Sequence, residues 1–372
     1  MPQVTSDQVM RTLEGVRDPE LGGNVVELGM ITDVVLDGGD VEIGLALTIA
    51  ECPLRNQIET DTRRRVASMP GVENVTIRTT AMTKSQRAEL MSVARRHVRE
   101  NAEPTQVSST TRVIAIASGK GGVGKSSLAV NIAAGLADRG FAVGLLDADI
   151  WGFSIPRMIG ARGRLEADAG SSLIQPVEAT GVKVVSTGLI IESEDTALMW
   201  RGLMLSKALE QFLKQVEWGD LDYLILDMPP GTGDVQMALT RMLPQAEMIV
   251  VTTPQRAAQR VAIRVADMAR RSHMPVVGVI ENMSGDVFGH GGGQQLADEL
   301  GVPLLASIPL DQAVVEGGDQ GHPVVLRTES GEAAIALQEA LDMVIAVVPP
   351  ADMETCTGRI AKLIADLEDG AA

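Results

Sequence analysis

The chain is poor in cysteine and has no long apolar segment. Its 372 residues include two cysteines, Cys52 and Cys356, which lie far apart and form no C-x-x-C pair. A disulfide framework is therefore not expected. The sequence has no uninterrupted apolar run of about 18 residues and no basic-then-apolar leader at its start. These absences argue against a membrane span and against secretion, and they predict a cytoplasmic protein.

Aromatic residues and positive charge are also scarce. Aromatic side chains make up 2% of the sequence and hydrophobic residues 45%, so the core must consist of Val, Leu, Ile, Ala and Met. A chain of this length predicts two or three domains. The formal net charge of −17 disfavours broad attraction to nucleic acid or to anionic lipid. We therefore expect no nucleic acid partner and no membrane span.

A glycine-rich loop between an apolar run and a helical run organises the rest of the chain. The apolar run covers 112–117 and the helical run 128–137, which predicts the order strand, loop, helix. Glycines in such a P-loop let backbone N–H groups surround a di- or triphosphate at the start of the helix. Lys125 is expected to reach the outer phosphates of ATP, and Ser126 to hold Mg²⁺. The nucleotide contacts predicted from this loop are Gly119, Lys120, Gly121, Gly122, Val123, Gly124, Lys125, Ser126 and Ser127.

A second lysine distinguishes this loop from an ordinary P-loop. Lys120 directly follows the first glycine of the pattern, where the ordinary motif requires no cation. This extra cation indicates a role beyond the one assigned to Lys125.

The first part of the chain has the pattern of a small α+β domain, over residues 1–83. Asp37-Gly38-Gly39-Asp40 is typical of a hairpin turn between two strands. Residues 84–111 combine a charged helical stretch with a linker around Pro104. The elements predicted before that are a helix capped by Ser6-Asp7 and ended by Asp18-Pro19, strands Met30–Leu36 and Val41–Ile49, a helix ending at Met69, and a strand over Val72–Arg78.

From residue 112 to residue 372, strands and helices alternate. This pattern predicts an α/β fold in which a doubly wound, mostly parallel sheet is covered by helices on both faces. Ligands of such sheets bind at the carboxyl ends of the strands. The predicted strands are Val113–Ala117, Phe141–Leu146, Val182–Ser186, Tyr223–Leu226, Met248–Thr252, Val276–Ile280 and Leu304–Ile308.

Acidic residues follow two of these strands. Asp227 fits the acid that holds Mg²⁺ through water beside Ser126. Asp149 is a candidate for orienting the water that attacks the γ-phosphate, with Asp147 supporting the metal or the loop. The alternative is that one of these two acids only caps the segment that follows.

Later strand ends supply candidate contacts to the nucleotide. Asn282 carries an amide that can pair with the adenine edge, and Pro309 is placed to flank the ring. The alternative for a strand-end asparagine is a turn former. Gly231-Thr232-Gly233-Asp234 is typical of a flexible segment that senses the γ-phosphate.

Cys52 has two interpretations. It lies between a strand and the first turn of a helix, where the helix dipole favours a thiolate suited to an iron–sulfur cluster. The neighbouring Glu51 opposes thiolate formation. The alternative is a small buried apolar residue at a strand end.

Two sets of motifs resemble known families. Asp18-Pro19-Glu20, the segment 26–31 and Glu51-Cys52-Pro53-Leu54 resemble the small SufT-like domains associated with iron–sulfur assembly. The later motifs resemble the Mrp/ApbC family of ATP-dependent iron–sulfur cluster carriers, which are deviant Walker A ATPases. These motifs are Gly119–Ser126, Asp147–Gly152, Asp227–Asp234, Glu281–Ser284 and Ile308–Asp311.

The resemblance implies an ATPase that carries iron–sulfur clusters to apoproteins and works with iron–sulfur assembly proteins. It also implies a homodimer in which Lys120 reaches across to the partner's ATP. Carriers of this family usually have a C-x-x-C pair soon after the Glu-Asn-Met segment, for cluster ligation. Here the segment 284–295 contains no cysteine, and His290 is either a substitute ligand or a solvated loop residue.

Two other functions remain open. One is an ATP-gated scaffold that binds protein clients and no cluster. The other is a positioning ATPase of the MinD/ParA type, which needs a membrane-targeting helix or a DNA-binding surface. The last segment, 353–372, carries more acidic than basic residues, a poor balance for anionic lipid.

Overall fold

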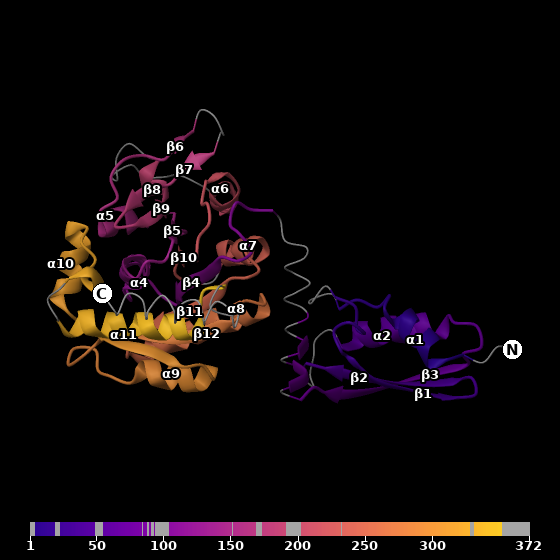
Figure 1. The fold of residues 1–372 in the computed structure, drawn as a ribbon. Helices are drawn as coiled ribbons and strands as arrows, with labels where there is room; N and C mark the ends of the chain where they lie inside the picture. Colours follow the sequence, from indigo (N-terminus) through magenta and orange to yellow (C-terminus); the bar gives the residue numbers. More distant parts are fainter. Residues whose placement is uncertain are drawn as a thin grey trace, which may run out of the picture. The chain divides into compact units, whose positions relative to one another are not determined.

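The computed structural model describes residues 4–18, 23–48, 55–83, 85–87, 89–90, 93, 104–150, 152–168, 173–190, 202–231, 233–327 and 331–351. The chain divides into two compact units, Met1–Asn101 and Ala102–Ala372. Each unit has a main sheet of its own (Figure 1). Cys52 and Cys356 lie outside the described residues, as does most of the helical stretch predicted after residue 83.

The first unit is a three-stranded sheet with two helices. Its elements are α1 (Ser6–Leu13), β1 (Ile31–Asp37), β2 (Asp40–Leu47), α2 (Arg55–Ala67) and β3 (Asn74–Ala81). The central strand β2 pairs antiparallel with β1 and parallel with β3. Both helices lie on one face of the sheet (Figure 1). The predicted order of helix, strand, strand, helix and strand is therefore confirmed.

The ends of α1 differ slightly from the prediction. Thr5, rather than Ser6, is the N-cap, because its hydroxyl accepts from the N–H of Gln8 while the Gln8 side chain accepts from the N–H of Thr5. The helix ends at Leu13, before the predicted stop at the Asp-Pro pair. Gly15 lies in the turn that follows, in keeping with the low helix propensity of glycine.

The second unit contains an eight-stranded sheet. Its strands are β4 (Arg112–Ser118), β5 (Val143–Asp147), β8 (Val177–Ala179), β9 (Val182–Val185), β10 (Tyr223–Asp227), β11 (Glu247–Thr252), β12 (Val276–Ser284) and β13 (Leu304–Pro309). Their order is β13-β12-β11-β4-β10-β5-β9-β8, and every neighbouring pair is parallel except β8 with β9. Each predicted strand is present. β8 has three residues and is too short to show a sequence pattern.

Side chains of the central strand β4 enter a hydrophobic core on each face of this sheet. Ile114 and Ile116 belong to one core, whereas Val113, Ala115 and Ala117 belong to the other. Successive side chains of a strand point to opposite faces, so a strand that is apolar at every position must be covered twice. This burial on both faces explains why β4 is apolar along its length, as expected for a doubly wound sheet.

Helices cover both faces (Figure 1). The helices of this unit are α4 (Lys125–Asp138), α5 (Ile155–Ile159), α6 (Gly202–Gln215), α7 (Asp234–Met242), α8 (Arg256–Arg271), α9 (Gly292–Leu300), α10 (Gln312–Gln320) and α11 (Glu332–Val347). Two short 3₁₀ segments, η1 (Thr187–Leu189) and η2 (Val324–Leu326), and a two-stranded ribbon, β6 (Glu166–Ala167) with β7 (Ile174–Gln175), complete the described elements. None of the described helices is both long and apolar enough to cross a membrane.

The strand order reverses at β4. After β4, the chain passes through α4 to β5, which lies beyond β10, whereas β11, β12 and β13 extend the sheet on the other side. A reversal of this kind leaves a crevice at the carboxyl end of the strand where it occurs. The glycine-rich loop begins there, directly after Ser118.

Candidate functional site

The carboxyl ends of neighbouring strands bring two aspartates to the P-loop strand. Asp227, the last residue of β10, is in register with Asp147 of β5 on one side and with Ile116 of β4 on the other. Both aspartates are 0% exposed. A carboxylate that is removed from water requires a cation, a proton or several hydrogen bonds.

The P-loop closes over the start of α4 and needs glycine at particular positions. Gly122 and Gly124 have φ angles of +78° and +81°, in the left-handed region. A Cβ atom at Gly124 would lie 2.2 Å from the side-chain nitrogen of Asn282. At Gly119 it would lie 2.5 Å from the backbone of Val261. The loop therefore fits closely between α8 and β12 and presents the backbone of the α4 N-terminus, which attracts phosphate.

Lys125 and Asp227 form a buried ion pair inside this loop. The Lys125 Nζ atom lies 2.5 Å from Asp227 Oδ1, and their side chains are 7% and 1% exposed. The ammonium also donates to the Ser126 hydroxyl at 3.4 Å. Asp227 Oδ2 is buried and has no hydrogen-bond partner among the described residues. The expected phosphate-binding lysine thus contacts the expected metal-binding acid directly.

The oxygen atoms beside the P-loop fit Mg²⁺. This ion prefers oxygen ligands and usually keeps several waters, so one hydroxyl and one carboxylate are a sufficient protein contribution. The Ser126 hydroxyl and the unpartnered oxygen of Asp227 meet that requirement. Asp147 is already engaged, because its oxygens accept from the Ser186 hydroxyl at 3.0 Å and from the Asp149 N–H at 3.2 Å. Of the two roles expected for Asp147, supporting the loop is therefore the better fit.

Asp147 makes the stability of the nucleotide-free chain depend on pH. Burial, assisted by repulsion from Asp227, raises the pKa of Asp147 from 3.8 to about 8. The folded chain therefore keeps a proton that the unfolded chain releases between these two pH values, so this group lowers stability as pH rises through that window. We compare the free energies of unfolding of Asp147→Asn and the wild type by urea titration, in buffer that contains a chelator and no nucleotide. The stability of Asp147→Asn relative to the wild type should increase from pH 4 towards pH 8. Parallel pH profiles for the two proteins would contradict this assignment.

Lys120 makes a different contact from Lys125. Its half-buried side chain donates to the Gln255 side-chain oxygen at 3.3 Å, and Gln255 is the N-cap of α8. Its carbonyl accepts from the Ser118 hydroxyl at 3.0 Å. Within the described part of the chain, no carboxylate pairs with the Lys120 ammonium. The lysine therefore lies at the edge of the P-loop rather than at its buried centre.

The segments after β5 and β10 are tied down near the loop. Asp149 is half-buried, and its carboxylate accepts from the Gly152 N–H at 3.3 Å, which is the geometry of the capping alternative. Gly231 donates from its N–H to the Ser118 carbonyl at 2.9 Å, although its neighbour Thr232 lies outside the described residues. The first residue of the segment 231–234, the expected γ-phosphate sensor, is therefore hydrogen-bonded to the end of β4.

A cavity of about 180 Å³ adjoins the P-loop. Gly124, Ser127 and Asn282 line it from the P-loop side, and Pro309 lines it from the end of β13. The Asn282 side-chain nitrogen also donates to the Val123 carbonyl at 2.8 Å. The two residues expected to contact the base therefore share one cavity with the phosphate loop, and Asn282 holds that loop as well.

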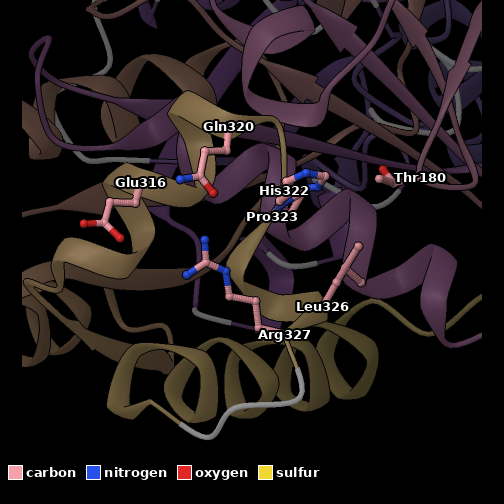
Figure 2. A pocket seen from close by; sticks show the side chains of 7 residues that line it. All are labelled: Thr180, Glu316, Gln320, His322, Pro323, Leu326 and Arg327. Atoms are coloured by element: carbon pink, nitrogen blue, oxygen red, sulfur yellow. The ribbon is translucent and has the colours of Figure 1, made fainter.

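A larger hollow of about 610 Å³ lies against the opposite face of α10. Figure 2 shows Arg327 extending toward the helix that carries Glu316 and Gln320. No P-loop residue lines this hollow, in contrast to the smaller cavity. The lining residues of the hollow are Thr180, Glu316, Gln320, His322, Pro323, Leu326 and Arg327.

Comparison with known families decides how the two units are classified. Residues 6–78 match the model of an iron–sulfur cluster assembly protein. Residues 109–345, more than half of the chain, match the model of the NUBPL iron-transfer P-loop NTPases. The chain belongs to this iron-transfer P-loop NTPase family.

Relatives that match most of the length of this iron-transfer NTPase share one name. An iron–sulfur cluster carrier protein from Mycobacterium leprae (strain TN) is 46% identical over 336 residues, covering 86% of this chain and 87% of the relative. A protein of the same name from Synechocystis sp. (strain ATCC 27184 / PCC 6803 / Kazusa) is 43% identical over 348 residues, covering 90% and 95%. A nucleotide-binding protein from Archaeoglobus fulgidus, solved with ADP and with cobalt, is 28% identical with a TM-score of 0.51, covering 64% and 98%. The resemblance inferred from the motifs is confirmed.

The iron-transfer NTPase has no cysteine in the segment 284–295, which follows Asn282. There, Gly285 and Gly289 exchange backbone hydrogen bonds of 3.0 and 2.7 Å, which close a short hairpin. The side chain of His290 is exposed. Within the described part of the chain, no three His, Cys, Asp or Glu side chains are grouped to hold a metal ion. Cys52, the predicted cluster ligand, lies outside that part.

Glu281 is a buried acid to which the sequence assigned no specific role. It is 1% exposed and accepts from the N–H groups of Gly291 at 3.2 Å and Gly293 at 2.5 Å, and from the Ser307 hydroxyl at 2.8 Å. An acid at the end of an apolar strand, followed by a glycine-rich segment, is the available sequence signal. Its partners lie up to 26 residues away, so the pattern alone could not identify them.

Proposed function

We propose that this chain is an ATP-hydrolysing carrier that delivers iron–sulfur clusters to apoproteins as a homodimer. The observation that carries the proposal is the buried pair of Lys125 and Asp227 within a P-loop of the iron-transfer NTPase family. The relatives named as cluster carriers span both units of the chain and support the cargo.

Nucleotide binding would use Lys125 and Asp227, which form an ion pair with each other in the nucleotide-free chain. The N–H groups at the start of α4 would hold the phosphates, and Lys125 would turn from Asp227 toward the outer phosphates. Asp227 and Ser126 would then hold Mg²⁺, and the bound ion would neutralise negative charge on the phosphates. Asn282 and Pro309 would contact adenine in the cavity that Gly124 also lines, in keeping with the ADP in the Archaeoglobus relative.

Lys120 would complete the site of a second protomer. It stands at the rim of the P-loop and is held by one hydrogen bond to Gln255, at 3.3 Å, so little is lost when it moves. A cation that arrives from a partner can stabilise charge on the transferred phosphoryl group, as an arginine finger does. Asp149 is half-buried at the same edge of the sheet, and it would release the Gly152 N–H that it accepts from here in order to orient the attacking water.

The cargo would be held outside the NTPase unit. The hairpin after Asn282 offers no thiolate, and thiolates are the usual ligands of iron–sulfur clusters. We therefore propose Cys52, in the unit that matches iron–sulfur assembly proteins, as a cluster ligand. Residues of this unit would also contact assembly partners.

Anaerobic reconstitution with iron and sulfide tests the cargo. We expect the wild-type chain to bind iron and sulfide and to gain visible absorbance. Cys52→Ser should lose most of this bound iron, because serine is a poor replacement for a thiolate. Cys356→Ser is the matched control and should bind as wild type does.

Two outcomes would contradict the cargo assignment. Equal iron content in the wild type and in Cys52→Ser would exclude this cysteine as a ligand. A wild-type chain that binds ATP but retains no iron would favour the alternative of an ATP-gated scaffold for protein clients, which the cysteine-free hairpin already supports.

A further inference from the structure

Consecutive residues at the end of β12 hold two different parts of the molecule. Asn282 is 7% exposed, and its side-chain nitrogen donates to the Val123 carbonyl of the P-loop at 2.8 Å. A Cβ atom at Gly124 would lie 2.2 Å from that nitrogen, so the approach depends on glycine. Any displacement of the loop at this point must also displace Asn282 or break its hydrogen bond.

The preceding residue holds the start of α9. Glu281 accepts from the N–H groups of Gly291 and Gly293, and the N-cap Gly291 has no side chain to do this itself. A carboxylate at a helix N-terminus satisfies free N–H groups and interacts favourably with the helix dipole. The Ser307 hydroxyl donates to the same carboxylate at 2.8 Å, which fixes its orientation.

The backbone just after this pair is strained. Met283 has a φ of +59°, although it is not a glycine, and the register with β13 shifts between Asn282 and Ser284. Non-glycine residues rarely adopt the left-handed region, and they persist there where the surroundings hold them in place. The Ser284 carbonyl accepts from the Leu310 N–H at 2.8 Å, beside the nucleotide cavity.

A short hairpin lies between these two anchors. Gly285 and Gly289 close it by mutual backbone hydrogen bonds, and Val287 at its tip is 75% exposed. Its first strand follows the Asn282 anchor, and its second leads through His290 into the α9 N-terminus that Glu281 holds. The position of the tip is therefore set from both ends by neighbouring side chains of β12.

We propose that Glu281 and Asn282 are positioning residues that transmit the nucleotide state of the P-loop to the Gly285–Gly289 hairpin. When phosphates engage the loop, the Val123 carbonyl shifts, Asn282 follows it, and Glu281 carries the change to the α9 N-terminus. The exposed tip then differs between the free and the nucleotide-bound chain. This inference rests on the proposed function, because it presupposes that nucleotide binds at the P-loop.

Hydrogen exchange of the full-length chain with and without Mg-ADP tests the inference. In the wild type, we expect Mg-ADP to slow exchange of the amides in 285–293 by at least about fivefold. Glu281→Gln should abolish this response while binding ADP within about twofold of wild type. The reason is that the NH₂ group of glutamine is a donor, and it would face backbone N–H groups that now donate to the carboxylate.

Two further variants make the result specific. Glu299→Gln makes the same chemical change on the exposed side of α9 and should respond as wild type does. Ser307→Ala removes one donor to Glu281 but leaves the carboxylate, and it should give an intermediate response. It serves as the second test if Glu281→Gln does not fold.

The outcomes separate this inference from the proposed function. Wild-type ADP binding without any change at 285–293 would overturn the inference and leave the proposed function standing. A full response in both Glu281→Gln and Ser307→Ala would overturn it as well. Absence of ADP binding by the wild type would overturn both.

Discussion

Lys125→Ala is expected to lower ATP hydrolysis by at least about 100-fold, which is the scale of loss when a group that stabilises transition-state charge is removed. Lys125 is the buried cation at the centre of the P-loop, 7% exposed. Lys120, the other lysine of the P-loop, does not take its place, because its ammonium contacts the Gln255 side chain instead. Phosphate release at saturating Mg-ATP measures the effect, and Lys207→Ala, at an exposed lysine of α6, is the control.

The same substitution should destabilise the fold. Removing Lys125 leaves Asp227 buried without its cation, and breaking a buried ion pair costs about 3–5 kcal/mol. Urea unfolding without nucleotide measures this loss. The double variant Lys125→Ala/Asp227→Asn removes both charges, so it should regain most of the stability while remaining inactive. Hydrolysis at the wild-type rate by a folded Lys125→Ala chain would refute the assignment of the site.

Lys120→Ala is expected to retain nucleotide binding and to lose hydrolysis by about 1,000-fold, the lower range for an arginine finger. Its side chain is half-buried and makes one hydrogen bond, to Gln255, so its removal should change stability by less than about 0.5 kcal/mol. This separation of activity from stability distinguishes it from Lys125→Ala. Binding of fluorescent ADP and phosphate release are the two measurements.

Arg256→Ala is the matched control for this variant. Arg256 is an exposed cation next to Gln255, at the first position of α8, so its loss changes the local charge by the same amount. It should hydrolyse ATP as the wild type does. A similar loss in both variants would show that general positive charge matters, and unchanged hydrolysis in Lys120→Ala would remove this lysine from the mechanism.

Local sequence patterns were sufficient to predict the layers of the fold. The P-loop, the apolar strands and the acids that follow them are each contained in a short stretch of sequence. Backbone hydrogen bonding and burial on both faces then determine the parallel sheet. The position of Asp227 beside the P-loop strand follows from the strand-end rule. By contrast, the N-cap of α1 moved by one residue, because Thr5 and Gln8 form a capping box together.

Side-chain partners that are distant in sequence could not be predicted in this way. Lys125 and Asp227 are 102 positions apart, and Asn282 and Val123 are 159 apart. Nothing in the residues around Asn282 indicates that its amide holds the P-loop in addition to facing the cavity. The sequence likewise places Ser186 only at the end of a strand and does not indicate that its hydroxyl donates to Asp147. These contacts arise from how strands are ordered in the sheet.

Under the proposed mechanism, a complete catalytic site needs two protomers, and a mixture of two inactive variants tests this requirement. Lys120→Ala keeps an intact P-loop, and Lys125→Ala keeps the lysine that would reach across. If the site is shared, an equal mixture should recover about a quarter of wild-type hydrolysis, because about half of the dimers are mixed and each has one complete site. Hydrolysis that stays at the level of the separate variants, although the two chains are shown to form mixed dimers, would contradict a site shared between protomers.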